Sequence, residues 1–273
     1  MVSAVAYAAP ELTVTSVGQY IEIDNDSNTG ATKGKADIGE AVHFANFVNL
    51  AYDDWSFGLM ARKAWYMDTD DGVKSAGHRI DMTATKNFGN YTLGARFRNE
   101  KSYDGYYLMG SYKYGMFAGD GYISYRAVNE KGVTDSQSDY WYSELEPIRV
   151  NVGPVQLAYY LEAYNYVNDD TTFENIWNHQ ARIRGKVYTG ERLTLGLEYR
   201  YQFSDVEERN NNKVSANDSQ HTILATAAYK VTENLTVDGY YQYEMNKYQG
   251  LNGATANPDD YYGEFLVRWT YKF

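Results

Sequence analysis

The chain has 273 residues, no cysteine, four prolines, 29 tyrosines and a formal net charge of −11. No window approaches the roughly 18 consecutive apolar residues that a membrane-spanning helix needs, and the acidic balance argues against a nucleic-acid partner, which requires a basic surface. The length and the tyrosine-rich composition are compatible with one β-barrel, in which half of each strand faces a polar interior.

The first residues, Met1 to Pro10, are similar to the end of a secretory signal. Ala6-Tyr7-Ala8 has the small-x-small form that precedes cleavage, although the positive n-region and most of the apolar segment are missing. We expect residues 1–8 to be a truncated signal-peptide remnant or a cloning scar, with a disordered N-terminal arm as the equal alternative. The expected barrel domain covers residues 9–273.

Segments in which polar and apolar residues alternate recur along the rest of the chain, each about 10 to 14 residues long. They predict fourteen strands, which begin near Glu11, Glu40, Trp55, Gly77, Tyr91, Gly105, Gly119, Ser138, Val155, Asn175, Glu191, Gln220, Leu235 and Asp259. Twelve or sixteen strands remain open. The first strand separates its two faces poorly, and Pro147 interrupts the eighth, as a bulge or a break would.

The predicted connections are of two kinds that alternate along the chain. Short turns fall at 53–54, 87–90, 115–118, 151–154, 189–190 and 231–234, and mostly longer loops at 25–39, 68–76, 102–104, 130–137, 168–174, 205–219 and 249–258. Outer-membrane barrels have short periplasmic turns and long extracellular loops. We therefore predict an all-β, closed antiparallel transmembrane barrel in the lipid of a bacterial outer membrane, with both termini periplasmic.

The last strand carries the clearest membrane pattern. Counting back from Phe273, alternate residues are Tyr271, Trp269, Val267 and Phe265, and the residues between them are mostly polar. Aromatic residues gather at the end of this apolar face, as in the aromatic girdles of membrane barrels.

The same alternation assigns charged residues to the interior of the barrel. The predicted pore-lining basic residues are Arg62, Arg79, Arg96, Arg98, Arg126, Arg182, Arg184, Lys186, Arg200 and Arg268, and the acidic ones are Asp81, Glu100, Glu162, Glu198, Asp238, Glu244 and Glu264. A basic residue on the lipid face near the midplane costs about 2–4 kcal/mol. Inward placement is thus enforced and does not by itself indicate a function.

The basic residues fall into two groups, Arg62 to Arg126 on the third to seventh strands and Arg182 to Arg200 on the tenth and eleventh. These strands lie nearly opposite each other in a fourteen-stranded barrel, so we expect two facing basic walls. Arginine binds carboxylates with bidentate geometry and stays charged, and rings of Arg or Lys are typical of anion-selective pores. Inward tyrosines such as Tyr107, Tyr160 and Tyr164 would stack on sugars. The alternative is that the charges pair across strands and only keep the interior wet.

The whole layout resembles the small monomeric porins of the OmpG type, through its strand count, its turn–loop asymmetry and the ending Trp269-Thr-Tyr-Lys-Phe273. The interior pattern is similar to that of the oligogalacturonate-specific porins, whose narrower barrels carry two arginine tracks for acidic sugars. The matching residues are Arg96 and Arg98 against Arg182, Arg184 and Arg200. This chain differs by its greater length, two extra strands and its inward acids.

Enzymatic and metal sites are not indicated. The four histidines, His43, His78, His179 and His221, stand beside no evident set of nucleophile, base and orienting group. Asp24 to Gly30 begins like a calcium loop, but its glycine comes one residue late and Lys35 stands where the closing glutamate belongs. We expect no enzyme activity, no cofactor and no metal.

The sequence therefore predicts a monomeric outer-membrane porin for passive diffusion of small hydrophilic solutes. Its arginine-lined interior would favour anionic solutes such as acidic oligosaccharides. The alternative is a barrel scaffold whose extracellular loops act as a surface receptor or adhesin.

Overall fold

The computed structural model describes residues 10–27, 37–67, 72–129, 138–167, 175–209, 212–214, 219–247 and 260–273. The segment 1–8, expected to be a signal remnant, lies outside these residues. No helix in the described part of the chain is long and apolar enough to cross a membrane.

The described residues form fourteen long strands, and a three-residue strand, β12, pairs only with β11. The strands are β1 Thr13–Ser27, β2 Asp37–Tyr52, β3 Trp55–Tyr66, β4 Lys74–Asn87, β5 Tyr91–Glu100, β6 Tyr103–Tyr114, β7 Phe117–Val128, β8 Tyr140–Val152, β9 Val155–Tyr166, β10 Asn175–Thr189, β11 Leu193–Arg209, β12 Asn212–Val214, β13 Ser219–Lys230, β14 Leu235–Lys247 and β15 Asp260–Lys272.

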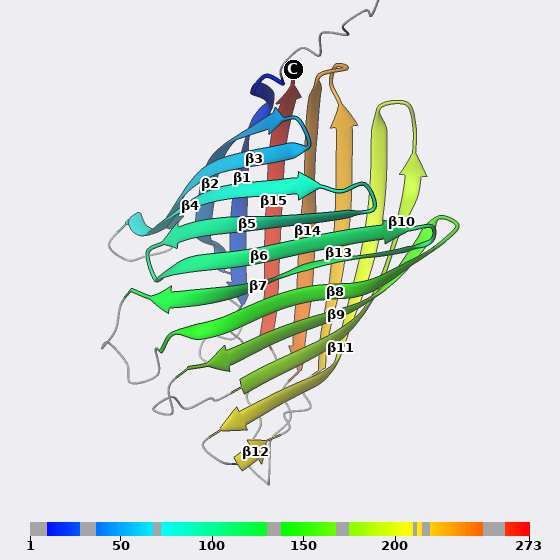
Figure 1. Ribbon diagram of the computed structural model, residues 1–273. Coiled ribbons are helices and arrows are strands. Elements are labelled where there is room, and N and C mark those ends of the chain that lie inside the picture. Colours follow the sequence, from blue (N-terminus) through cyan, green and yellow to red (C-terminus); the bar gives the residue numbers. More distant parts are fainter. Residues whose placement is uncertain are drawn as a thin grey trace, which may run out of the picture.

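These strands close into one antiparallel barrel. Each long strand pairs with the long strands before and after it in the chain, so that β11 pairs with β13. The barrel is closed by β1 and β15, which pair from Ser16 opposite Lys272 to Ser27 opposite Tyr261. Figure 1 shows β3 to β9 crossing one wall obliquely, while β13, β14, β15 and β1 run along the other wall. The predicted closed fourteen-stranded antiparallel barrel is confirmed.

Both ends of the described chain lie at the end of the barrel that carries the short turns. The hairpins there are joined by two to four residues, as in Asp53-Asp54, Gly115-Met116 and Gly153-Pro154. Asp53, Gly115 and Gly153 have φ values of 52°, 59° and 59°, the left-handed conformation that tight hairpin turns require. At the opposite end, β5 and β6 are joined by two residues, and the other connections include residues outside the described ranges.

The ladder extends further toward the loop end than the sequence indicates. Asn25 and Asp26, and Asp205 to Glu208, which we predicted to lie in loops, belong to β1 and β11. That part of the prediction is wrong. Hydrogen bonding between strands continues past the apolar band, where side chains on both faces are polar and no alternation marks a strand.

The outer surface is an aliphatic belt between two aromatic rings. The exposed aliphatic and methionine side chains are Leu59, Met82, Leu93, Leu108, Ile123, Leu157, Ile183, Leu197, Ile223 and Val267. Exposed aromatic residues lie toward the short-turn end at Trp55, Tyr91, Tyr114, Phe117, Tyr188, Tyr229 and Tyr271, and toward the loop end at Tyr106, Trp141, Trp177, Phe203, Tyr243 and Tyr261. Amphipathic rings favour the membrane–water interface, so this surface matches a lipid bilayer.

A bulge in β8 changes which residues face inward. Leu145 pairs with Leu161, but the next pair is Ile148 with Tyr159, so the register shifts around Pro147. Pro147 has no N–H to give to the ladder, and prolines within sheets favour bulges for this reason. Even-numbered residues point inward before the shift, and odd-numbered residues such as Arg149 point inward after it.

We predict that Leu108→Arg lowers the free energy of unfolding by about 2–4 kcal/mol, because it puts a charge halfway along β6 on the aliphatic belt. Met116→Arg, in the turn after β6, introduces the same charge at the rim and should cost about 0–1 kcal/mol. Urea unfolding of barrels inserted in lipid vesicles, followed by tryptophan fluorescence, measures both. Equal losses would contradict a membrane position for the belt.

Gly18 of β1 is a point of close contact. A Cβ there would come within 2.3 Å of both the Phe47 ring and the Trp269 carbonyl oxygen. We expect Gly18→Ala to lower the free energy of unfolding by about 1–3 kcal/mol through overpacking. Gly110→Ala is the control, since its Cβ would meet Leu93 at an ordinary 3.6 Å, and the same urea measurement should show no comparable loss.

Candidate functional site: the charged interior of the barrel

Charged side chains converge on the inner face of the barrel and contact residues two strands away. Arg62 on β3 lies 3.4 Å from Glu22 on β1 and 3.2 Å from Glu100 on β5. Arg184 on β10 lies 2.7 Å from Glu146 on β8. Contacts that skip a strand are expected where side chains meet on the concave side of a curved sheet.

The strand register places the other predicted charged residues on the same inner face. On this inner face lie Arg62, Arg79, Arg96, Arg98, Arg126, Arg182, Arg184, Lys186, Arg200 and Arg268, together with Asp81, Glu100, Glu162, Glu198, Asp238, Glu244 and Glu264. The structure does not, however, spread these charges evenly.

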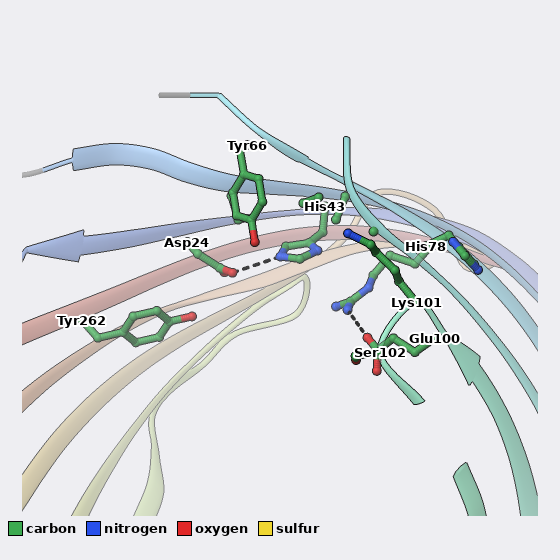
Figure 2. Close-up of a pocket in the computed structure, with 13 residues that line it drawn as sticks. Asp24, His43, Tyr66, His78, Glu100, Lys101, Ser102 and Tyr262 are labelled. Carbon is green, nitrogen blue, oxygen red and sulfur yellow. Dashed lines mark hydrogen bonds and ion pairs between the residues drawn. The ribbon is translucent and has the colours of Figure 1, made fainter. Parts of the chain in front are cut away.

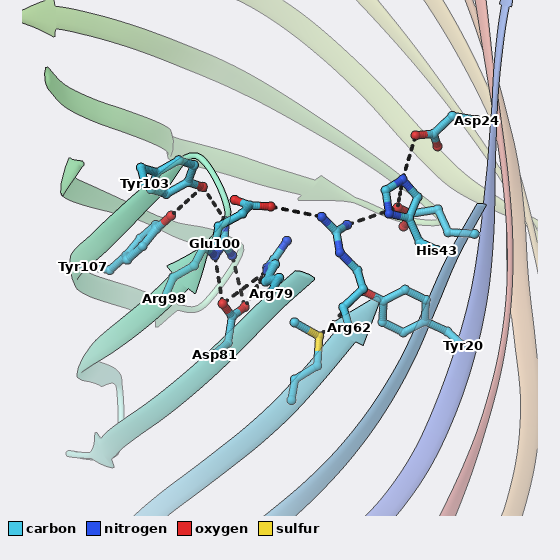
Figure 3. A network of polar contacts seen from close by, with 12 residues as sticks. Tyr20, Asp24, His43, Arg62, Arg79, Asp81, Arg98, Glu100, Tyr103 and Tyr107 are labelled. Atoms are coloured by element: carbon cyan, nitrogen blue, oxygen red, sulfur yellow. Dashed lines mark hydrogen bonds and ion pairs between the residues drawn. The ribbon is translucent and has the colours of Figure 1, made fainter. Parts of the chain in front are cut away.

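The first group, which we call the β4–β7 cluster, consists of Arg79, Asp81, Arg96, Arg98 and Arg126. Asp81 accepts hydrogen bonds from Arg79 Nη2 at 2.6 Å and from Arg98 Nε at 2.8 Å. Figure 3 shows both guanidinium groups converging on this carboxylate. Asp81 and Arg98 are almost completely buried, at 6% and 8% exposure. The cluster therefore contains four guanidinium groups and one carboxylate, which contacts two of them.

Two members of this cluster are held by tyrosine rings instead of carboxylates. The Arg126 guanidinium carbon lies 3.7 Å from the ring centre of Tyr142 and 4.7 Å from that of Tyr103. Arg96 lies 5.4 Å from the ring centre of Tyr107. Within the described residues, neither Arg96 nor Arg126 has a carboxylate within ion-pairing distance, and the Nε atoms of both are buried without a hydrogen-bond partner.

The second predicted basic wall is largely neutralised. Glu146 lies 2.7 Å from Arg184 and 3.6 Å from Arg182, and Glu198 lies 2.7 Å from Arg200. Arg182 also stacks on Tyr160, with 3.5 Å from its guanidinium carbon to the ring centre. The two facing basic walls expected from the sequence are thus unequal, because acids neutralise the wall of β8 to β11.

Acidic side chains predominate on β14, β15 and β1, the strands around the β1–β15 pairing that closes the barrel. Glu264 accepts hydrogen bonds from the hydroxyls of Tyr240 and Tyr262, and Glu244 accepts one from Gln220 at 2.8 Å. Asp238 forms an ion pair with Arg268 at 2.7 Å, in which the Arg268 side chain is 47% exposed. Acidic residues therefore predominate on the inner face at β14, β15 and β1, whereas the β4–β7 cluster contains four guanidinium groups and one carboxylate.

A third group of inner-face charges contains Glu162, whose carboxylate is hydrogen-bonded by tyrosines. Its carboxylate accepts hydrogen bonds from the hydroxyls of Tyr142 at 2.6 Å and Tyr164 at 2.9 Å. Glu144, directly opposite Glu162 in the ladder, accepts one from Tyr122 at 2.7 Å. Tyrosine hydroxyls thus stabilise these two carboxylates without a cation.

Several charged residues of the inner face are not among those predicted from the sequence: Glu22, Asp24, His43, Glu144, Glu146 and Arg149. Those on β8 were missed because the bulge at Pro147 breaks the two-residue period. Those on β1 and β2 were missed because the first strand separates its faces poorly. Two signals were available, the Pro147 interruption and the polar residues at alternate positions from Tyr20 to Asp24.

Space for a solute remains beside the β4–β7 cluster. A cavity of about 630 Å³ is lined by Arg79, Asp81 and Arg96, and by Tyr20 and Arg268 from the other side. A second cavity, of about 500 Å³, lies toward the loop end beside Arg62 and Glu100 (Figure 2). The positive cluster is thus accessible to a small hydrophilic molecule inside the barrel.

No protein-family model and no curated protein sequence matches this chain. Solved structures do match it along nearly its whole length. A bacterial polysaccharide outer membrane secretin has a TM-score of 0.55 at 8% identity, covering 94% of this chain and 98% of that one. The OmpT outer membrane protein of Vibrio cholerae, in its trimer form, gives 0.50 at 11% identity, with 97% and 100% covered. The anion-selective porin from Comamonas acidovorans gives 0.49 at 12% identity, with 96% and 100% covered.

The chain shares the β-barrel fold of these outer-membrane proteins. At these identities the likeness extends to the fold alone. Together with the aliphatic belt and its two aromatic rings, the closed barrel fold places the protein in a bacterial outer membrane. What passes through the barrel has to be argued from its own inner face.

Asp81 stabilises the barrel as the counter-ion of the buried Arg98 and the partly buried Arg79. We predict that Asp81→Asn lowers the free energy of unfolding by about 3–5 kcal/mol, because it leaves the Arg79 and Arg98 charges without their counter-ion. Asp238→Asn is the control. It removes the same charge from the half-exposed pair with Arg268 and should cost about 0–1 kcal/mol. Urea unfolding in detergent measures both, and equal costs would show that the interior screens the two pairs alike.

Proposed function

We propose that the protein is a porin through which small hydrophilic solutes diffuse passively, with a preference for anionic solutes such as acidic oligosaccharides. The observation that carries the proposal is the β4–β7 cluster, in which Asp81 pairs with Arg79 and Arg98 while Arg96 and Arg126 pack against tyrosine rings. Such an excess of fixed positive charge beside an open cavity attracts anions and repels cations.

Arg96 and Arg126 are the residues that we expect to contact the solute. Neither is paired with a carboxylate among the described residues, so an incoming anion does not have to displace one. Arginine presents two parallel N–H groups that match a carboxylate. The rings of Tyr103, Tyr107 and Tyr142 hold these guanidinium groups in place. These residues are only 4–8% exposed, so the sugar stacking expected from the sequence for Tyr107 is not supported.

The wall of β8 to β11 plays a smaller part in this proposal. Glu146 and Glu198 already occupy Arg182, Arg184 and Arg200, so a solute would have to compete with them. Lys186 lies beyond these pairs, in a cavity toward the short-turn end. It would add a weaker positive charge to the path.

The orientation and the assembly are also proposals. We place both termini in the periplasm because the short turns share their end of the barrel, as in other outer-membrane barrels. Because one chain encloses the whole cavity, we propose that a monomer suffices for transport. Diffusion of this kind needs no cofactor and no covalent chemistry. The receptor or adhesin alternative depends on loops that lie largely outside the described residues.

The test is the reversal potential of the purified protein in a planar bilayer under a potassium chloride gradient. We expect an anion preference that falls markedly in the Arg96→Gln, Arg126→Gln double variant. The double variant Arg149→Gln, Arg268→Gln removes the same charge from arginines that have carboxylate partners. It should change the preference less, because it leaves the β4–β7 cluster intact.

Current block by an oligogalacturonate, compared with a neutral oligosaccharide of equal length, tests the solute class in the same bilayer. Selective block by the acidic sugar, lost with Arg96 and Arg126, would support acidic oligosaccharides as solutes. A cation preference, or equal effects of the two double variants, would reject the anion proposal and leave a general porin. A barrel that folds but never conducts would favour the receptor alternative.

A further inference from the structure

Glu22, Asp24 and His43 come together on the inner face of β1 and β2, toward the loop end of the barrel. His43 Nε2 lies 3.0 Å from Asp24 Oδ2 and 3.9 Å from Glu22 Oε1, and the ligand atoms of all three residues lie within 4.8 Å of one another. Figure 3 shows the contact between the His43 imidazole and the Asp24 carboxylate. We propose that these three residues bind a divalent transition-metal ion, of which Zn²⁺ is the best match.

The ligand set and its spacing suit such an ion. Zn²⁺ is bound by imidazole nitrogen and carboxylate oxygen at about 2.0–2.2 Å, in tetrahedral geometry with a water in an open position. Ligand atoms around a tetrahedral ion of that size lie about 3.4 Å apart. The two distances from His43 Nε2 fall on either side of this value. Small side-chain rotations would therefore complete the site without moving the strands.

The surrounding charge favours a cation. Asp24 lies directly opposite Glu264 in the ladder between β1 and β15, and like charges in opposed positions destabilise a sheet. Among the described residues, the cation nearest to this cluster is Arg62, which contacts Glu22 at 3.4 Å and is shared with Glu100 at 3.2 Å. One guanidinium group thus serves several carboxylates, and negative charge remains uncompensated.

An unused ligand atom points to the same conclusion. Oδ1 of Asp24 is buried and makes no hydrogen bond within the described part of the chain. A buried carboxylate oxygen without a partner is unfavourable, and coordination to a metal would satisfy it. The cluster also borders the cavity of about 500 Å³ at the loop end, which gives an ion access from the interior (Figure 2).

The site is separate from the β4–β7 cluster, so the inference does not depend on the proposed transport. It also reverses the expectation, drawn from the sequence, that the chain holds no metal. The calcium-loop pattern that we rejected uses Asp24 with residues that follow it, whereas this site joins Asp24 to residues of its own strand and the next.

Isothermal titration of the tag-free, folded barrel in detergent with ZnCl₂ tests the inference. We expect one Zn²⁺ per barrel, and an affinity at least about tenfold lower in His43→Gln and in Asp24→Asn, since loss of a supporting residue alone costs 10–100-fold. His221→Gln is the matched control. Its imidazole hydrogen-bonds to Tyr199 and stacks on Tyr201, on the opposite face of the wall, so the affinity should not change.

Substitution with Co²⁺ adds a readout that a purely structural role would not produce. Visible d–d absorption that appears in the wild type and in His221→Gln, and is lost in His43→Gln, would place the metal on the His43 imidazole. Heat-modifiable migration on gels establishes that each variant is folded before titration. Absence of Zn²⁺ binding in the folded wild type, or equal affinities in all variants, would overturn the inference.

Discussion

Closure of the hydrogen-bonded ladder is the constraint on which the rest of this structure depends. Every long strand is paired on both sides, so the remaining variable for each strand is which set of alternate residues faces inward. In a bilayer the apolar set faces outward, because a charged side chain on the lipid face destabilises the barrel. Most charged side chains of the spanning strands then share the interior, where they pair, stack or remain as fixed charge.

This constraint explains which features could be predicted from the sequence. The fourteen spanning strands follow from the two-residue period, and the short turns follow from residues such as Asp53 and Gly153 that tolerate a left-handed conformation. The face of each charged residue follows from its apolar neighbours. The inward residues of β8 and β1 could not be predicted in this way. Alternation does not identify the inward face where a bulge shifts the register, as in β8, or where both faces are polar, as in β1.

Contacts between side chains could not be predicted from the same pattern. Arg62 reaches Glu22 and Glu100 two strands away on either side. Such a contact depends on the stagger of strands around the barrel, which alternation within one strand does not reveal. For this reason the sequence indicates two basic walls, whereas the structure has one excess of positive charge and one set of ion pairs. Glu146, hidden by the bulge, is the residue that makes the difference.

The tyrosines of the interior determine how the unpaired arginines behave. A long arginine side chain facing an open lumen would sample many rotamers, and ordering it around a solute would cost about 0.5–1.5 kcal/mol. Arg126 is instead packed against Tyr103 and Tyr142, so this ordering occurs on folding. Cation–π contact stabilises the guanidinium group without neutralising it. Tyrosine thus preserves the positive field that a carboxylate partner would cancel, and it fixes the direction from which an anion can approach.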